Sequence, residues 1–583
     1  ALRILKCYRR AIVLTAGGLA LMRLCLQLCW GEPLINLIFS MLGTIFFVLF
    51  LATFLDWVRV RGRHAVQYFI IGLALGILLD TAIHGAFASY DIVWQADLVP
   101  ILITLALILL QFLFLAGILL TIDLDAFGTA SGAANKSYAW VAIGPFLFLE
   151  LMAFCNIARL AVLTGWSFHV AFGWVMLSQL AVIVLLVWLF NKGFKNWLPA
   201  VLVSGLFLLA TTAIANPHQT WLAALNQFIG QLSAVLLLVF ILLAISERTK
   251  SGRFSSVIVP NGIGMILLAV LLLGYYAVYQ ISLPYENTMI EPIAGLIIAI
   301  CAIASYKAIG QSVKIRFRTF LVPLLASILL ILPLAGIAVW QEPETETGNG
   351  FPLRIMTYNL HNGFNTDGFL DMEELASVIE QSDPDIVALQ ELSRGWLISG
   401  RLDMLFWLSQ RLDMPYVSGP TADSFWGNAV LSRYPIVEYN NYELPPRDLF
   451  ILRGFTEAII DIGGQNLRII ATHYHHLEDG SEIRMQQSSA ILDFWKGSGN
   501  TIILGDFNAE TDSPEIVMLL EAGLIDAAAL IQPPDDYTFR SDDLYQRIDY
   551  IWLSPDLVSG QVYIPQSQAS DHLAVIADVN RRN

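Results

Sequence analysis

The chain has 583 residues, of which 56% are hydrophobic and only 14% charged, and its formal net charge is −15. Soluble proteins hold about 25% charged residues, so this composition excludes a fully soluble protein, and the length excludes one compact domain. Residues 1–350 contain 19 Lys and Arg against 14 Asp and Glu, whereas residues 351–583 contain 14 against 34. We therefore predict an apolar membrane domain over residues 1–340, an acidic linker over 341–350, and an acidic soluble domain from Phe351 onward.

The first domain is predicted to be an all-α polytopic membrane domain of about eleven helices. A helix needs about 20 consecutive apolar residues to cross a bilayer. The segments that meet this length are 11–30, 34–55, 66–88, 98–122, 138–157, 167–190, 197–216, 222–245, 261–283, 290–306 and 319–340.

The connections between these segments predict how the chain is oriented. The N-terminus and every second connection together hold 17 Lys and Arg, whereas Arg159 stands alone near the opposite face. The 17 residues are Arg3, Lys6, Arg9, Arg10, Arg59, Arg61, Arg63, Lys136, Lys192, Lys195, Arg248, Lys250, Arg253, Lys307, Lys314, Arg316 and Arg318. Because basic loops stay in the cytoplasm, the N-terminus is expected there. After an odd number of spans, the C-terminal domain is expected outside the cytoplasm: in the periplasm or cell exterior, or in the ER lumen of a eukaryote.

Four ionisable residues lie inside the predicted spans: Arg23, Asp80, His84 and Glu150. A charge at membrane depth is costly and usually has a partner or faces a cavity. Asp80 and His84 lie four residues apart on one helix face. Two interpretations stay open, a polar site for a lipid headgroup or substrate path, and a structural contact between helices.

The soluble domain shows short alternating runs in place of long apolar ones. Strands are predicted at 354–360, 385–391, 429–432, 455–462, 467–472, 501–506, 547–553 and 573–579. Helices are predicted at 371–381, at 482–495 and from Ser513-Pro514 onward, where proline suits the first helical position. Strands outnumber helices and form both hairpins and strand–helix–strand units. This order predicts an α/β sandwich of two sheets with helices outside.

Polar residues gather where these strands begin or end. They are Asn359, Glu391, His473, Asp506, Asn508, Asp549, Asp571 and His572. Carboxylates and an amide form an oxygen shell that suits Mg²⁺ or Mn²⁺. All five cysteines lie in the first domain, so a thiolate zinc site is excluded from the second. A hard cation that polarises a phosphoryl oxygen, beside a histidine held by a carboxylate, indicates phosphoester hydrolysis.

Seven short motifs lie in the order of one known family. They are Met356-Thr-Tyr-Asn359, Ile386-Val-Ala-Leu-Gln390-Glu391, Gly427-Asn-Ala-Val-Leu-Ser-Arg433-Tyr-Pro435, Ala471-Thr-His473, Gly505-Asp506-Phe-Asn508-Ala509, Arg547-Ile-Asp549-Tyr550 and Ser570-Asp571-His572. With these motifs the soluble domain resembles the endonuclease/exonuclease/phosphatase superfamily. The resemblance implies a DNase I-like four-layer sandwich and a metal-dependent phosphoric ester hydrolase. It also implies that Glu391 is the principal metal ligand, with Asn359 beside it and Asp571 contributing.

The resemblance implies a catalytic group of His473, Asp506, Asn508, Asp549 and His572. Asp506 would orient or activate the attacking water, and Asn508 would hold the scissile phosphate. His473 would bind a phosphate oxygen or serve as the acid. Asp549 would fix the tautomer of His572. The base role stays open between the histidine and an aspartate.

Substrate-binding residues are harder to select from the sequence. We expect phosphate contacts from Arg433 and Arg540, with Arg447 and Arg453 as further candidates, and a substrate-facing role for His475. His361 departs from the residue that some nucleic-acid-repair members carry at this place, which weakens the transfer of a repair function.

The charge of the soluble domain bears on its substrate. A net charge of −20 over residues 351–583 argues against a nucleic-acid partner, and a tethered hydrolase most naturally meets a membrane lipid or lipid-linked phosphoester. The order of many spans followed by this domain resembles the C-terminal part of the family of Cwh43 and PGAP2-interacting proteins, which is linked to lipid remodelling of glycosylphosphatidylinositol (GPI) anchors. In a bacterium another lipid would take the place of that anchor. Two alternatives are an extracytoplasmic nuclease for phosphate scavenging, and a transporter or scaffold with a degenerate hydrolase domain.

Overall fold

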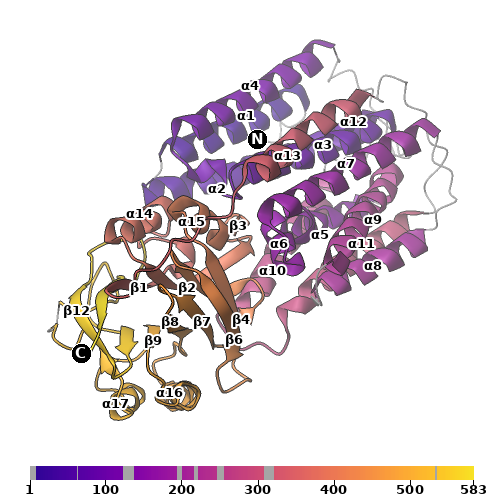
Figure 1. Ribbon diagram of the computed structural model, residues 1–583. Helices are drawn as coiled ribbons and strands as arrows, with labels where there is room; N and C mark the ends of the chain where they lie inside the picture. The colour runs from indigo at the N-terminus through magenta and orange to yellow at the C-terminus, as the bar shows by residue number, and fades with distance from the viewer. Residues whose placement is uncertain are drawn as a thin grey trace. The chain divides into compact units, whose positions relative to one another are not determined.

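A computed structural model describes residues 8–29, 31–61, 63–121, 137–192, 200–215, 221–245, 255–306, 321–531 and 535–582. The chain divides into two compact units, Ala1–Val339 and Trp340–Asn583. The first is helical and the second contains two β-sheets (Figure 1).

The helical unit follows the predicted apolar segments in order. Its elements are α1 (Tyr8–Leu28), α2 (Pro33–Arg61), α3 (Arg63–Ala86), η2 (Ile92–Trp94), α4 (Leu98–Thr121), η3 (Ser137–Ala142), α5 (Ile143–Leu149), η4 (Glu150–Phe154), α6 (Ile157–Thr164), α7 (Phe168–Lys192), α8 (Ala200–Ala215), α9 (Trp221–Ile245), α10 (Ser255–Ala277), η5 (Asn287–Met289), α11 (Ile290–Tyr306), α12 (Leu321–Ala326), η7 (Ser327–Leu330) and α13 (Ile331–Val339). Each of the eleven predicted segments overlaps one or more of these helices, which confirms the all-α prediction.

Within the described ranges, nine helices are long and apolar enough to cross a membrane. A tenth span is reached if the pair Tyr138–Phe154 and Ile157–Thr164, bent by 49°, counts as one, and the apolar stretch Ala200–Ala213 of α8 is shorter. Several of these helices have exposed leucine side chains, such as Leu102, Leu109 and Leu113 of α4. Long apolar helices with apolar outer surfaces indicate insertion into a bilayer.

The bend in the fifth predicted segment has a local cause. A π-helical turn occupies η4, and the Asn156 side chain then caps α6 by accepting a hydrogen bond from the Arg159 N–H at 3.0 Å. Because Asn156 has extended backbone angles, it interrupts the preceding helix, and α6 begins after it in a different direction. The segment 138–157 is therefore one arm of a bent pair.

Two charged groups of this unit have partners inside it. Glu150 accepts hydrogen bonds from Gln231 of α9 at 3.0 and 3.1 Å, and Arg159 forms a buried ion pair with Glu291 of α11. For Glu150, the structural interpretation fits these contacts. Much of the basic-loop pattern lies outside the described residues: Arg3, Lys6, Lys136, Lys195, Arg248, Lys250, Arg253, Lys307, Lys314, Arg316 and Arg318.

The second unit is built on two mostly antiparallel sheets. One has the strand order β12-β13-β1-β2-β5-β4, with β3 paired to β2, and the other has the order β10-β11-β9-β8-β7-β6. The strands are β1 (Leu353–Asn359), β2 (Ile386–Trp396), β3 (Leu402–Asp403), β4 (Tyr416–Asp423), β5 (Trp426–Ser432), β6 (Ile436–Glu443), β7 (Gly454–Asp461), β8 (Asn466–His473), β9 (Thr501–Asp506), β10 (Ile525–Asp526), β11 (Asp549–Leu553), β12 (Leu557–Tyr563) and β13 (Val575–Arg581). The helical elements are η8 (His361–Gly363), α14 (Met372–Ser382), α15 (Met404–Leu412), α16 (Ser481–Trp495) and α17 (Pro514–Glu521).

Alternating side chains divide the core of this unit into layers. Ile469 of β8 packs into the core between the two sheets, whereas the next residue, Ile470, packs toward Ile491 of α16 and Ile516 of α17. Successive residues of a strand face opposite sides, so one strand serves both layers. Helices α14 and α15 lie outside the first sheet and α16 and α17 outside the second (Figure 1). The predicted four-layer α/β sandwich is confirmed.

Candidate active site

The predicted site residues meet because parallel strands bring their carboxyl ends to one edge. In the first sheet β1 pairs with β2 in parallel, with Asn359 beside Gln390. In the second, β8 and β9 are parallel and place His473 beside Asp506, which also faces Asp549 of β11. The Asn359 Nδ2 donates to Asp506 Oδ2 at 3.0 Å, and this bond joins the two sheets.

Asp506 lies at the centre of these contacts. Its Oδ2 is 3.4 Å from His473 Nε2 and 3.7 Å from His572 Nε2, and its Oδ1 accepts the Asn508 N–H at 2.9 Å. Burial raises the pKa of Asp506 to about 7 against the opposing charge of His572. A buried carboxyl group that has a pKa near neutral pH and lies between two imidazoles can exchange a proton with water.

His572 is fixed by a second carboxylate. Its Nδ1 lies 2.9 Å from Asp549 Oδ2, which orients Nε2 toward Asp506. Burial lowers the pKa of His572, but Asp549 and Asp506 outweigh it and raise the pKa to about 10. The Ser570 hydroxyl accepts the His572 N–H at 3.2 Å and donates to the Asn359 carbonyl at 2.8 Å, so the loop is held to the end of β1.

Glu391 is turned into the site by an irregular backbone. It has a φ of 56°, and the pairing of β2 with β5 shifts register between Leu389 and Leu392. Such a bulge re-aims one side chain at the rim of a sheet. Asn362 Nδ2 donates to Glu391 Oε2 at 3.1 Å, and Asn362 Oδ1 accepts the Trp426 indole N–H at 2.8 Å.

Two places in this site have the donor chemistry for a cation. Burial, and then the charge of Asp571, raise the pKa of Glu391, so a cation at Glu391 would offset like charges. Ligand atoms of Asp506, Asp549 and His572 lie within 4.8 Å of one another. In this second cluster, however, Asp549 Oδ2 and His572 Nδ1 already bond each other. Glu391 accepts one bond at Oε2 from Asn362, which leaves lone pairs on its carboxylate for a divalent cation.

Asn359 and Asn508 have protein partners for their amides. The Asn359 oxygen accepts the His361 N–H at 3.0 Å while its nitrogen bonds Asp506, which leaves one lone pair for a cation. Asn508 has a φ of 49° and donates from Nδ2 to the Tyr474 carbonyl at 3.2 Å, which leaves one amide proton for a substrate.

The arginine of the site is Arg453. It is buried beside His473, whose Nδ1 is 3.0 Å from Nη1, and its guanidinium lies 5.5 Å from the Trp426 ring centroid. Burial lowers the pKa of Arg453 to about 10, against the opposing charges of Glu391 and Asp506. Burial and the Arg453 charge lower the pKa of His473 well below its usual value, so His473 is neutral.

The structure places Arg433, a predicted substrate-binding residue, apart from the other predicted site residues. Arg433 pairs with exposed Asp383, and it follows Ser432, which pairs with Ile386 at the start of β2, far from Glu391. The antiparallel pairing of β5 with β2 carries Arg433 to the opposite end of the sheet.

Two further residues were predicted to contact substrate. Arg540 follows Phe539, whose ring packs 4.8 Å from that of His572, but its guanidinium pairs with Asp542 at 3.1 Å. His475 is buried at 2% exposure, and its N–H donates to Gln487 Oε1 at 2.9 Å. Among the described residues, the Arg540 side chain pairs with Asp542 and His475 is held by Gln487, and neither is bonded to Asp506.

Sequence reasoning passed over Asn362 and ranked Arg453 below Arg433. The sequence did contain a signal for Asn362, since the polar residues Asn359, His361 and Asn362 follow the end of a strand. No local feature separated Arg453 from the other arginines.

Comparison with known proteins agrees with this geometry. Residues 356–572 match the Endonuclease/Exonuclease/phosphatase family. This part of the chain is an endonuclease/exonuclease/phosphatase domain. Members of this family are phosphoesterases or nucleases, and they usually use divalent metals.

Relatives of the chain are distant. Protein cwh43 of Schizosaccharomyces pombe is 23% identical over 226 residues, which are 38% of this chain and 23% of that protein. Uncharacterized protein YbhP of Escherichia coli is 22% identical over 249 residues, 40% of this chain and 97% of that protein. The chain thus spans less than a quarter of the length of cwh43.

Solved structures of the fold are similarly distant. The endonuclease/exonuclease/phosphatase from Beutenbergia cavernae is 23% identical, with a TM-score of 0.35, over 39% of this chain and 71% of that one. The human Nocturnin catalytic domain with bound sulfate is 22% identical, with a TM-score of 0.33, over 40% of this chain and 94% of that one.

Proposed function

We propose that the chain is a membrane-anchored phosphodiesterase that uses a divalent cation, Mg²⁺ or Mn²⁺, to hydrolyse a lipid or lipid-linked phosphoester outside the cytoplasm. The hydrolase class is supported by the family domain and by the convergence of Asp506, Asp549 and His572 at one sheet edge. The extracytoplasmic side is supported by the basic residues in alternate loops.

The short tether is the observation that favours a lipid substrate. Helix α13 ends at Val339, and the N–H of Glu346 already donates to the Arg433 carbonyl of the sheet domain. An extended chain spans at most about 3.5 Å per residue, so this stretch reaches about 25 Å. An enzyme tethered this closely to the last apolar helix meets phosphoesters of the membrane surface first.

The residues of the site divide the chemistry between them. A cation held by Glu391 and Asp571 would polarise a phosphoryl oxygen and stabilise the leaving oxygen. Asp506, between the two imidazoles, orients the attacking water and accepts its proton. His572, held by Asp549, donates a proton to the leaving oxygen.

Two neighbouring residues complete the phosphate site. Arg453 adds a buried positive charge beside Glu391 and Asp506, where the charge of the phosphate develops. Asn508, fixed to the Tyr474 carbonyl, holds a phosphate oxygen with its remaining amide proton.

The test is hydrolysis by the purified full chain with Mg²⁺ or Mn²⁺. The substrates are vesicles of phosphatidylethanolamine, phosphatidylinositol or sphingomyelin, with DNA as a separate arm. We expect a lipid phosphodiester to be cleaved and Asp506→Asn to lose activity. The matched control is Asp461→Asn, because Asp461 ends β7 in the same sheet and caps a turn outside the site. Cleavage of DNA alone would support the nuclease alternative, and no hydrolysis in any arm would support a transporter or scaffold. Full activity of Asp506→Asn would contradict the catalytic role of Asp506.

A further inference from the structure

A second polar site lies in the helical unit, remote in sequence from the hydrolase domain. A cavity of about 170 Å³ is walled by α1, α3, η2 and α4. The polar residues of its wall are Arg23, Asp80, His84 and Asp91.

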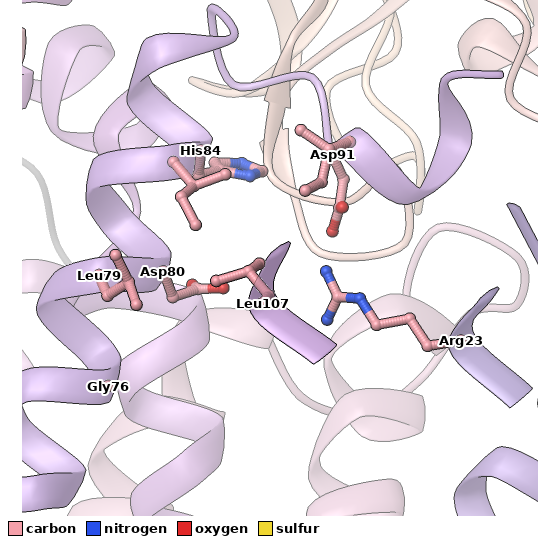
Figure 2. Close-up of a pocket in the computed structure, with 9 residues that line it drawn as sticks. Arg23, Gly76, Leu79, Asp80, His84, Asp91 and Leu107 are labelled. Carbon is pink, nitrogen blue, oxygen red and sulfur yellow. The ribbon is translucent and has the colours of Figure 1, made fainter. Parts of the chain in front are cut away.

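These four side chains point into one space (Figure 2). Within the described part of the chain, Arg23 makes no hydrogen bond or ion pair, so its guanidinium faces Asp80 and Asp91 across the cavity without binding either. Asp91 accepts the Val93 N–H at 3.0 Å, which holds its carboxylate in place. Arg23 is exposed near the end of an apolar helix, and a charge in such a helix that has no protein partner marks a place where a ligand supplies the partner.

The wall of the cavity is held in place by three glutamines. Gln27 of α1 donates to the Ile92 carbonyl at 2.8 Å and to the Gln95 carbonyl at 3.0 Å. Gln95 in turn donates to the Tyr90 carbonyl at 2.9 Å, and Gln111 of α4 donates to the Ala16 carbonyl of α1 at 3.1 Å. These bonds fix the loop that carries Asp91 against α1, so the cavity is preformed.

The depth of the polar groups matches the headgroup layer of a bilayer. Arg23 lies five residues before the end of α1, Asp80 lies six before the end of α3, and Asp91 lies beyond that end. At 1.5 Å rise per residue, both helical residues lie within about 9 Å of their helix ends. Since α1 and α3 end here and α4 begins here, the three helices meet the membrane surface together.

The charges define the chemistry of the ligand. One cation opposite two carboxylates complements a molecule with an anionic and a cationic end. A quaternary ammonium is usually recognised by aromatic rings, but the residues that line this cavity include none. Carboxylates instead suit a primary ammonium, which donates hydrogen bonds. Leu79, Ile83 and Leu107 supply apolar wall for the remainder of the ligand.

We propose that this cavity binds the headgroup of an ethanolamine-type phospholipid, with the phosphate against Arg23 and the primary ammonium against Asp80 and Asp91. The site goes beyond the hydrolase activity and does not rest on it, because all of its residues belong to the helical unit. It is a lipid-binding site, whether the bound lipid is a substrate or a structural component.

The test is lipid binding by the purified full chain in detergent micelles, followed by native mass spectrometry and by thermal stability. We expect phosphatidylethanolamine to be retained at least tenfold more tightly than phosphatidylcholine or phosphatidylglycerol. Arg23→Gln and Asp91→Asn should each remove this preference. The matched controls are Arg10→Gln near the other end of α1 and Asp97→Asn in the same loop, both exposed and outside the cavity.

A second arm separates a lipid from a soluble ligand with the same headgroup. Soluble glycerophosphoethanolamine should compete only weakly, because it lacks the acyl chains. If it binds as tightly as the lipid, the lipid assignment is overturned. Arg23→Lys keeps the charge and should retain part of the preference, which covers the case in which the glutamine variant does not fold. Equal retention of all three lipids, or an unchanged preference in both Arg23→Gln and Asp91→Asn, contradicts the proposal.

Discussion

Replacing Arg453 by glutamine is expected to remove most of the activity while the protein stays folded. The guanidinium contacts His473 and His476 and lies near the charges of Glu391 and Asp506. A hydrogen bond to a charged group contributes about 1.5–3 kcal/mol. Because each 1.36 kcal/mol changes a rate tenfold, one lost phosphate contact lowers kcat/KM by roughly 10–150-fold. We expect a loss near the upper end, since the variant also leaves the nearby carboxylates without a compensating cation.

The assay is the rate of phosphodiester hydrolysis by the full chain, with the melting temperature of the hydrolase domain measured in parallel. Arg433→Gln is the matched control, because Arg433 belongs to the same domain but pairs with exposed Asp383 at the other end of the sheet. Its activity should stay within about twofold of the wild type, as is usual for an exposed ion pair. An equal loss in both variants, or none in Arg453→Gln, would refute the assignment of Arg453 as the phosphate arginine.

Three further predictions address the metal, the orientation and the effect of pH. Asn362→Ala removes a hydrogen bond to Glu391, so half-maximal activity should need about 10–100 times more Mn²⁺. An unchanged Mn²⁺ titration would contradict the assignment of Glu391 as a metal ligand. Val437→Cys places a thiol on an exposed position of a domain that has no cysteine, and an impermeant maleimide should label it in intact cells; labelling only after lysis would reverse the orientation. Burial, and then Arg453 and Arg484, lower the pKa of His475 to about 4. The unfolded chain, with an ordinary histidine pKa of about 6.5, therefore binds more protons between pH 6.5 and 4. The contribution of neutral His475 to the free energy of unfolding is complete above pH 6.5 and falls by roughly 2–3 kcal/mol toward pH 4. In thermal melts, His475→Gln should therefore lose less stability than the wild type as the pH falls. Equal pH dependence in both proteins would contradict this reasoning.

Local patterns in the sequence predicted most of the fold. Apolar length marked each helical segment, and alternation marked the strands that have one face in the core. Strand β6 was missed because nearly all of its residues are exposed, so Asn440 and Asn441 give no alternating pattern, and its pairing with β7 makes it a strand. The bend at Asn156 was missed because hydropathy does not distinguish a capped break from a continuous helix.

The site shows where sequence reasoning ends. Motifs at strand ends identified Asp506, Asp549 and His572, because parallel strands bring such ends to one edge. The choice between Arg433 and Arg453 depends on which end of a strand each residue occupies and on packing against Trp426, and neither is encoded locally.

The helical unit gives a parallel case. Arg23 and Asp80 were each conspicuous as charges in predicted spans, but their convergence with Asp91 depends on how three helices pack.

The central claim, a cation-dependent phosphoesterase, is tested most directly by chelation and metal restoration. The measurement is the rate of lipid phosphodiester hydrolysis by the full chain in vesicles after removal of metal and during titration with Mg²⁺ or Mn²⁺. We predict that activity is lost on chelation, returns with either cation, and is not restored by the same concentrations in Glu391→Gln. Activity that persists in chelator, or a Glu391→Gln variant that titrates like the wild type, would contradict the claim.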